Sequence, residues 1–396
     1  MIIVSGRDGN GDEGADDDEV KGDLDHADHQ GELSVALVRP AVVGSSRPGH
    51  PARSRLVMGR CGRLVDAGER RMNVALSPHI HPALESLDSY DPSGGVAGAG
   101  GQMTYSILGF DPANGDLGVA VQSKFPGVGS LVPYGQADVG VVATQAFANP
   151  RHGTVGLALL RYGATPQQAM QVLLNNDTRV PERQVALIDR NGASAAYTGA
   201  DLDSWSGWSG SATGEGCVAI GNGLAGSDVV QEMVGSFHRT AERPLAERLI
   251  TALVAGEGAG GDIRGQQSAA LLVVRRNGGY GSLDDRHVVI SVYDHPRPIE
   301  ELQRCYALHR LSYFPSDPAN LVPIGPELAL ELKRLMARQG FYSGQLDGRW
   351  DAEIDRRLQL FLGSENYDNR IDNGGLVDLE VIADLRHRYG RTTAMP

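Results

Sequence analysis

The chain has few cysteines and no long apolar run. It contains 3 cysteines in 396 residues, far apart and without a CxxC pair, which fits a reducing compartment and offers no zinc site. No apolar run approaches the ~20 residues that a membrane-spanning helix needs, so we expect no membrane partner. The first residues lead into an acidic segment and not into the apolar core of a signal peptide, so we expect a cytoplasmic protein.

Positive charge is also scarce. With 36 Lys and Arg against 49 Asp and Glu, the net charge is -13, which argues against a nucleic-acid partner because such proteins cluster Lys and Arg against phosphates. There is no GxSxG elbow and no HExxH pair, and the GxGxxG letters at 256–261 follow a predicted helix instead of joining a strand to a helix. We therefore expect no metal and no organic cofactor.

Residues 1–102 differ in composition from the rest. An acidic run at 8–32 is followed by a basic run at 39–71, so little of this segment can bury a core. A glycine-rich stretch at 92–101 closes it as a flexible linker. Two interpretations stay open: a disordered tail, or an upstream extension with Met103 as the true start. A mature chain that begins at Met1 would end the second interpretation.

The most informative stretch begins at Met103. β-prone runs at 105–108 and 117–122, joined by turn residues at 111–115, predict a β-hairpin. Thr104 stands at its head. If Met103 is an initiator that is removed, Thr104 carries a free α-amine, which titrates near ~8 and can act as a base toward the hydroxyl of the same residue. The alternative is a surface threonine that opens a strand.

Beyond the hairpin, strand and helix patterns follow one another in blocks. Apolar strand patterns occur at 140–144, 183–189, 195–199, 217–220, 268–274 and 287–292. Helices are expected around Leu157 and Leu160, after a capping box at 165–168, after Ser227 and after Pro244. This order suggests two stacked sheets between helical layers. We predict an α+β fold, a four-layer αββα sandwich, over residues 103–316.

The pattern changes at about residue 322. Three helical stripes, at 328–336, 354–362 and 379–389, predict a small three-helix bundle over residues 322–390. The first two helices are joined by a loop at 340–350 that contains both glycines and aromatic residues.

Several motifs in order resemble the bacterial family known as domain of unknown function 1028. They are TYSI at 104–107, LGVAVQSKF at 117–125, TQAFANP at 144–150, GNGLAG at 221–226 and GGDIRGQQSAA at 260–270. The resemblance runs from Met103 to about Tyr313 and implies the N-terminal-nucleophile (Ntn) hydrolase fold, but no reaction. Because that family normally begins near this Met-Thr pair, the resemblance favours Met103 as the start.

The tail is similar to peptidoglycan-binding domains of the helical-bundle type. The similarity lies in residues 335–362, with the GFYSG and DGRW letters of the connecting loop. It implies a glycan or peptide partner. A chain without an export signal does not easily reach the cell wall, so we instead expect the bundle to serve homo-oligomerisation or the binding of an internal ligand. Sedimentation with insoluble wall material would overturn that preference.

Four residues are candidates for catalysis. Thr104 is the expected nucleophile, and Ser106, on the same face, is an auxiliary hydroxyl or the nucleophile itself. Lys124 is a candidate for holding the α-amine neutral, or else a solvated lysine. Asn222, which follows an apolar strand, is a candidate oxyanion donor, although asparagine beside glycine is also ordinary turn chemistry.

Five further residues are candidates for substrate binding. Asn149 is a second possible oxyanion donor. In the loop at 260–268, Arg264 can hold a substrate carboxylate and Asp262 can orient an amine, or the two form an internal ion pair that closes the loop. The remaining two candidates in this loop are Gln267 and Ser268.

Two functions from different classes follow. The first is an amidohydrolase that cleaves a C–N bond of a small, carboxylate-bearing substrate through an acyl-enzyme on Thr104. The second is a non-catalytic binding or scaffold protein whose C-terminal module binds a glycan or peptide. Intact-mass analysis separates them, because the enzyme requires a chain that begins at Thr104.

Overall fold

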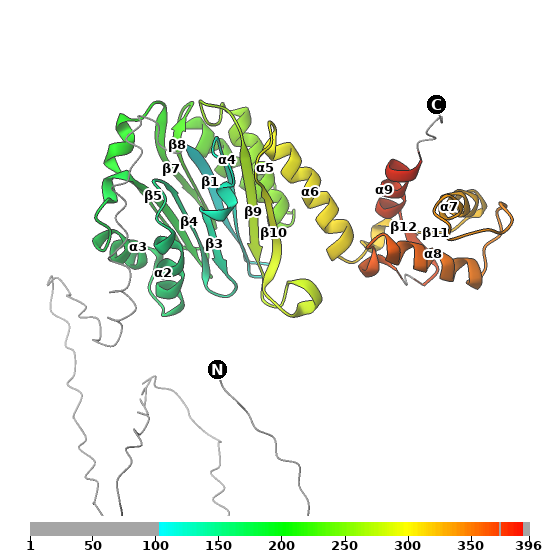
Figure 1. Ribbon diagram of the computed structural model, residues 1–396. Helices are drawn as coiled ribbons and strands as arrows, with labels where there is room; N and C mark the ends of the chain where they lie inside the picture. Colours follow the sequence, from blue (N-terminus) through cyan, green and yellow to red (C-terminus); the bar gives the residue numbers. More distant parts are fainter. Residues whose placement is uncertain (1–102, 372–373, 391–396) are drawn as a thin grey trace, which may run out of the picture. The chain divides into compact units, whose positions relative to one another are not determined.

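The computed structural model describes residues 103–371 and 374–390 (Figure 1). These residues form a mixed structure of helices and antiparallel sheets, so the predicted α+β class is confirmed. The two interpretations of residues 1–102 lie outside the described residues. No helix in the described part of the chain is long and apolar enough to cross a membrane.

The larger sheet has six antiparallel strands in the order β10-β9-β2-β1-β8-β7. Its central hairpin is the predicted one, with Thr104 opposite Ser123 at the open end and Asp111 opposite Asp116 at the turn. Strand β7 is an addition to the predicted strands, and its Ser- and Gly-rich residues are held by pairing with β8. The strands are β1 (Thr104–Asp111), β2 (Asp116–Ser123), β7 (Trp208–Gly214), β8 (Cys217–Leu224), β9 (Ser268–Val274) and β10 (Arg286–Val292).

The smaller sheet has four antiparallel strands in sequence order. Apolar side chains of its inner face, such as Val141 and Ile188, pack against Leu108 and Val121 of the larger sheet in one buried cluster. Strand β3 is an addition to the predicted strands. The strands are β3 (Pro133–Gln136), β4 (Gly140–Ala146), β5 (Arg183–Asp189) and β6 (Ser194–Thr198).

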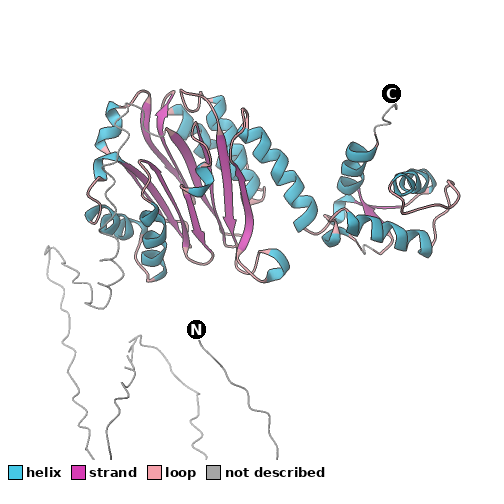
Figure 2. Ribbon diagram, in the orientation of Figure 1, coloured by secondary structure: helices cyan, strands magenta, loops and turns pink. Residues whose placement is uncertain are grey.

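Helices cover the outer face of each sheet (Figure 2). On the larger sheet, α4 (Asp228–Arg239), α5 (Leu245–Gly258) and α6 (Pro298–Tyr313) bury apolar side chains against β1, β2, β8, β9 and β10. On the smaller sheet, α2 (Pro150–Arg161) and α3 (Pro166–Asn175) pack against β4 and β5.

Helices begin at all four places that the sequence indicated, but one expected cap does not form. The Thr165–Gln168 capping box is present, so that α3 begins with both reciprocal hydrogen bonds. Helices α2 and α5 also form where expected. Helix α4 begins after Ser227, but the Ser227 side chain makes no capping hydrogen bond, since its backbone is already helical. Helix α6 was not predicted.

The C-terminal residues form α7 (Pro326–Arg338), α8 (Ala352–Ser364) and α9 (Leu379–Tyr389) around an apolar cluster that includes Met336, Phe361 and Leu385. A two-stranded antiparallel sheet of β11 (Leu321–Pro323) and β12 (Leu376–Asp378) accompanies them, which the sequence did not indicate. The loop at 340–350 is tied to α7 by the buried Lys333, whose Nζ lies 2.7 Å from Asp347 Oδ1.

Candidate functional site

A row of four polar residues crosses the open end of the central hairpin. Thr104 of β1 lies opposite Ser123 of β2 and opposite Asn222 of β8, and Ser123 lies opposite Ser268 of β9. Residues paired directly across antiparallel strands share a face of the sheet. All four are buried, and the row faces the smaller sheet, as Leu108 does four residues along β1.

The hydroxyl of Thr104 is oriented by Ser123. The two hydroxyl oxygens are 3.0 Å apart, and Ser123 Oγ donates to the carbonyl oxygen of Met103 at 2.7 Å. Because a hydroxyl has one proton, Ser123 must accept from Thr104. Thr104 therefore donates to Ser123, and Ser123 donates to the Met103 carbonyl.

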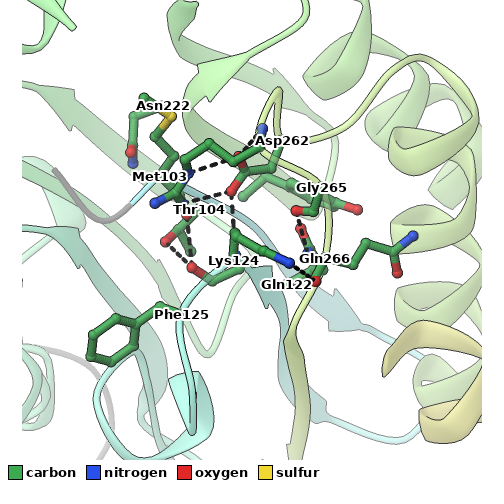
Figure 3. Close-up of polar contacts among 12 residues, drawn as sticks. Met103, Thr104, Gln122, Lys124, Phe125, Asn222, Asp262, Gly265 and Gln266 are labelled. Atoms are coloured by element: carbon green, nitrogen blue, oxygen red, sulfur yellow. Dashed lines mark hydrogen bonds and ion pairs between the residues drawn. The ribbon is translucent and has the colours of Figure 1, made fainter. Parts of the chain in front are cut away.

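The same carbonyl oxygen has a second donor. Arg264 Nη2 donates to Met103 O at 2.6 Å, and the guanidinium is also paired with Asp262, with Nη2 2.8 Å from Oδ2 and Nε 3.1 Å from Oδ1. Asp262 in turn accepts from the backbone N–H of Lys124 at 3.3 Å (Figure 3). The predicted internal ion pair is thus present, and it aims Arg264 at the peptide bond between Met103 and Thr104.

Side-chain amides from the smaller sheet support the other side of Thr104. Gln145 Nε2 donates to Thr104 O at 3.0 Å and to Gln184 Oε1 at 2.8 Å. Gln145 Oε1 accepts from Ser106 Oγ at 2.6 Å, so the Ser106 hydroxyl is directed at Gln145. This buried network joins β4 and β5 to β1, which fixes the start of β1 relative to the smaller sheet.

Asn222 offers an acceptor beside Thr104. Its Nδ2 donates to Gln184 Oε1 at 2.8 Å, whereas its Oδ1 is buried and has no hydrogen-bond partner within residues 103–371 and 374–390. A buried carbonyl oxygen without a donor is costly, which makes this atom a candidate contact for a ligand or an amine.

The side chains of Lys124, Gln267 and Ser268 make their hydrogen bonds elsewhere. Lys124 Nζ donates to Gln266 O at 3.0 Å, and Gln267 Nε2 donates to Asp294 Oδ1 at 3.2 Å. Ser268 Oγ donates to Phe125 O and accepts from Val128 N, although its strand position places it next to Ser123 in the polar row. These contacts stabilise the loops around the row.

Asn149 serves a helix start. Its side-chain oxygen accepts from Arg151 N at 3.1 Å as the N-cap of α2, and its Nδ2 donates to Asp177 Oδ2 at 2.8 Å. The side chain of Asn149 therefore makes these hydrogen bonds at the start of α2 and not to the polar row.

A second polar cluster lies on the helix side of the sheet. The buried Tyr105 donates to Glu257 Oε2 at 2.9 Å, and Gln266 Nε2 donates to Glu257 Oε1 at 2.7 Å. Burial, and then the Glu257 carboxylate, raises the pKa of Tyr105 well above its usual value, so the phenol stays a neutral donor. In the described part of the chain no group of three or more His, Cys, Asp or Glu residues is arranged to hold a metal ion.

Sequence reasoning missed the residues that hold Thr104 in this network, namely Ser123 and Gln145, which contact it, and Gln184, which contacts Gln145 and Asn222. Ser123 and Gln145 lie inside motifs that the sequence analysis quotes, at 117–125 and 144–150. Their convergence depends on strand register, which the local letters do not specify.

The comparisons with known proteins bear on two regions. The family described as "Family of unknown function (DUF1028)" matches residues 104–302, and the family described as "Putative peptidoglycan binding domain" matches residues 307–385. The crystal structure of protein SPO2555 from Silicibacter pomeroyi, titled with the same DUF1028 family, is similar over 52% of this chain and 89% of that chain, with 31% identity and a TM-score of 0.47. No curated protein matches the chain.

Proposed function

Since the chain belongs to the family of unknown function DUF1028, we propose its reaction from its own residues: an Ntn-type amidohydrolase in which Thr104 is the nucleophile. In this proposal the two stacked sheets and their helices are the αββα sandwich of that class. The mature chain begins at Thr104, whose free α-amine is the base. The substrate is a small amide that carries a carboxylate.

One observation carries the proposal. The Thr104 hydroxyl is hydrogen-bonded to Ser123 Oγ. Ser123 Oγ and Arg264 both donate to the carbonyl oxygen of Met103, whose carbonyl carbon is bonded to the nitrogen of Thr104. A carbonyl oxygen with a hydroxyl donor and a guanidinium donor is polarised, which is the requirement for stabilising an oxyanion. A merely structural threonine at the start of a strand does not need these two donors.

The reaction proceeds in two halves. The Thr104 hydroxyl attacks the amide carbon, its proton passes to the α-amine, and the carbonyl oxygen takes the negative charge between Ser123 and Arg264. The C–N bond then breaks, and the leaving amine takes the proton from the α-ammonium. Water attacks the resulting ester, the acid leaves, and Thr104 regains its proton.

The other predicted residues take supporting roles in this proposal. Asp262 orients Arg264, and Asn222 Oδ1 accepts a hydrogen bond from the α-amine. Ser106 positions Gln145, which holds the backbone of Thr104. Lys124 anchors Asp262 through its backbone N–H. Asn149, Gln267 and Ser268 shape the surrounding loops.

The test uses activated amides. Protein whose intact mass shows Thr104 as the first residue is incubated with p-nitroanilides of short carboxylic acids, and nitroaniline release is followed by absorbance. Thr104→Ala keeps the amine but lacks the hydroxyl, so we expect a loss of at least about 10³-fold, with Thr104→Ser retaining activity. Thr154→Ala, at an exposed position of α2, is the control. Full activity in Thr104→Ala rejects the proposal.

A second candidate function is favoured by the match at 307–385: the C-terminal domain binds peptidoglycan, and the whole chain is a binding or scaffold protein. This function needs no free Thr104 amine. Native protein that retains Met103 but sediments with insoluble peptidoglycan would support it over the hydrolase. Homo-oligomerisation stays a prediction, which sedimentation velocity of the native protein tests.

A further inference from the structure

The side chain of Met103 is buried next to Gly223 of β8, and we call the space that it occupies the seat of Met103. Its side chain is 5% exposed, although it precedes the first strand. A Cβ placed on Gly223 would lie 2.1 Å from Met103 Cγ and 2.3 Å from Sδ, so only glycine at 223 leaves room for this side chain. Gly223 also has a φ of 62°, in the left-handed region that glycine adopts without strain.

The seat has polar groups at the end next to Thr104. The carbonyl oxygen of Met103 accepts hydrogen bonds from Ser123 Oγ at 2.7 Å and from Arg264 Nη2 at 2.6 Å. The Oδ1 of Asn222, to which none of the described residues donates a hydrogen bond, is buried on the strand position directly opposite Thr104. The seat therefore combines the space for an unbranched apolar chain with two hydrogen-bond donors for an oxygen and one acceptor.

We propose that the seat of Met103 is the acyl subsite of the enzyme, and that it takes the acid half of the substrate: a short, unbranched aliphatic carboxylic acid. This inference rests on the proposed function, because the seat is vacated only when Thr104 is the first residue. The methionine shows what fits, namely a straight chain that lies against the backbone of Gly223 and has an oxygen between Ser123 and Arg264.

Charge and shape select the ligand. Arg264 is already neutralised by Asp262, but loss of Met103 adds the α-amine of Thr104 to the site, and a carboxylate balances the positive charge of its protonated form. A branched chain is disfavoured because a Cβ on Gly223 would lie 2.1 to 2.7 Å from Cγ, Sδ and Cβ of Met103, so the space between Gly223 and the chain does not hold another methyl group. The subsite therefore distinguishes pentanoate from its branched isomer 3-methylbutanoate.

Calorimetric titration tests this. Each acid is titrated into protein that begins at Thr104. We expect pentanoate to bind at least ~10-fold more tightly than 3-methylbutanoate. Protein that retains Met103 should bind neither, since the seat is full. Gly223→Ala should abolish pentanoate binding, whereas Gly115→Ala, also at a positive φ but with nothing within 4 Å of its Cβ, should leave it unchanged. Arg264→Gln gives the same readout if Gly223→Ala does not fold.

Failure of this inference differs from failure of the hydrolase proposal. Thr104→Ala lacks the nucleophile but keeps the amine and the seat, so it should bind pentanoate as the unsubstituted protein does. Hydrolysis without selective pentanoate binding would reject the subsite alone. Selective binding without hydrolysis would reject only the reaction. Equal binding to the Met103-retaining protein, or unchanged binding in both Gly223→Ala and Arg264→Gln, overturns the subsite.

Discussion

Ser123 is the residue through which the Thr104 hydroxyl and the neighbouring carbonyl oxygen are connected. It accepts from the first and donates to the second, and it is fully buried. A water molecule that replaced it would have to provide the same donor and acceptor in a packed sheet. The chemistry proposed for Thr104 therefore depends on a hydroxyl supplied by the neighbouring strand.

Replacing Ser123 tests that dependence. In Ser123→Ala the Thr104 hydroxyl loses its acceptor and the oxyanion loses one donor, while Arg264 stays in place. We expect kcat for anilide hydrolysis to fall by about 10²-fold, with a smaller change in KM. Ser364→Ala, at an exposed end of α8, serves as the control in the same kinetic assay. An unchanged kcat would remove Ser123 from the mechanism.

Tyr105 faces away from the proposed chemistry, and its effect should be on stability. Its buried hydroxyl donates to Glu257, and Tyr105→Phe leaves one carboxylate oxygen without that donor. We expect a loss of about 1–3 kcal/mol in the free energy of unfolding, measured by urea denaturation. Tyr162→Phe should have no effect, because Tyr162 is 88% exposed. A loss no greater than that of Tyr162→Phe would contradict this account.

At this scale, the sequence is sufficient for some site residues and not for others. Thr104, Asp262 and Arg264 are recognisable from their motifs, and Arg264, paired with Asp262, donates to the Met103 carbonyl that precedes Thr104. Gln145 and Gln184 are not recognisable, because each is a polar residue in an apolar strand. Gln145 contacts Thr104, and Gln184 contacts Gln145 and Asn222, only when the two sheets stack. Contacts between sheets follow from packing of distant segments, which local patterns do not encode.

Asp177 joins three secondary-structure elements after the end of α3. Its carboxylate accepts from Asn149, the N-cap of α2, from Arg183 at the start of β5, and lies 2.9 Å from His152 Nε2. The side chain is only 3% exposed. Desolvation alone would raise its pKa, but the hydrogen bonds from His152, Arg183 and Asn149 outweigh it and hold the pKa well below its usual range.

The pH dependence of stability follows from that shift. Because the folded pKa lies below the unfolded value of about 4, the contribution of Asp177 is complete above pH ~4 and is lost progressively as the pH falls further. We expect Asp177→Asn to lower Tm by several degrees, about 4 °C or more, at pH 7 and to flatten the fall of Tm between about pH 4 and 2. Thermal unfolding across this range measures both. Asp203→Asn, at an exposed position, should keep the steeper profile.

The helices and strands differ in how well the local sequence predicts them. The capping box of α3 and the β1–β2 hairpin are local, and both formed as expected. Strand β7 is not local: residues with low strand propensity become a strand because β8 provides a hydrogen-bonding edge. Helix α6 did have a signal, since Ile299, Leu302 and Tyr306 recur at helical spacing and are buried. The local sequence is therefore sufficient to predict helix α6.

At the scale of the whole molecule, two families meet in one chain. Residues 104–302 match one and residues 307–385 the other, as the two resemblances in the sequence indicated. The second match suggests a glycan ligand, and homo-oligomerisation or the binding of an internal ligand stays a prediction. Only a binding experiment on the full chain decides between these.

The loop at 340–350 is where we expect the C-terminal domain to contact a glycan, because aromatic residues there are only partly buried. Lys333, 1% exposed, holds this loop through Asp347, and its Nζ lies 5.5 Å from the centre of the Tyr342 ring.

Lys333→Met keeps an apolar stem of similar length inside the core but removes the charge that fixes Asp347. If the full chain sediments with insoluble peptidoglycan, we expect this variant to pellet several-fold less at equal concentration. Arg356→Met, on an exposed face of α8, is the control for loss of a positive charge. Equal pelleting of both variants would place the ligand away from this loop, and no pelleting of the unsubstituted protein would reject peptidoglycan as its partner.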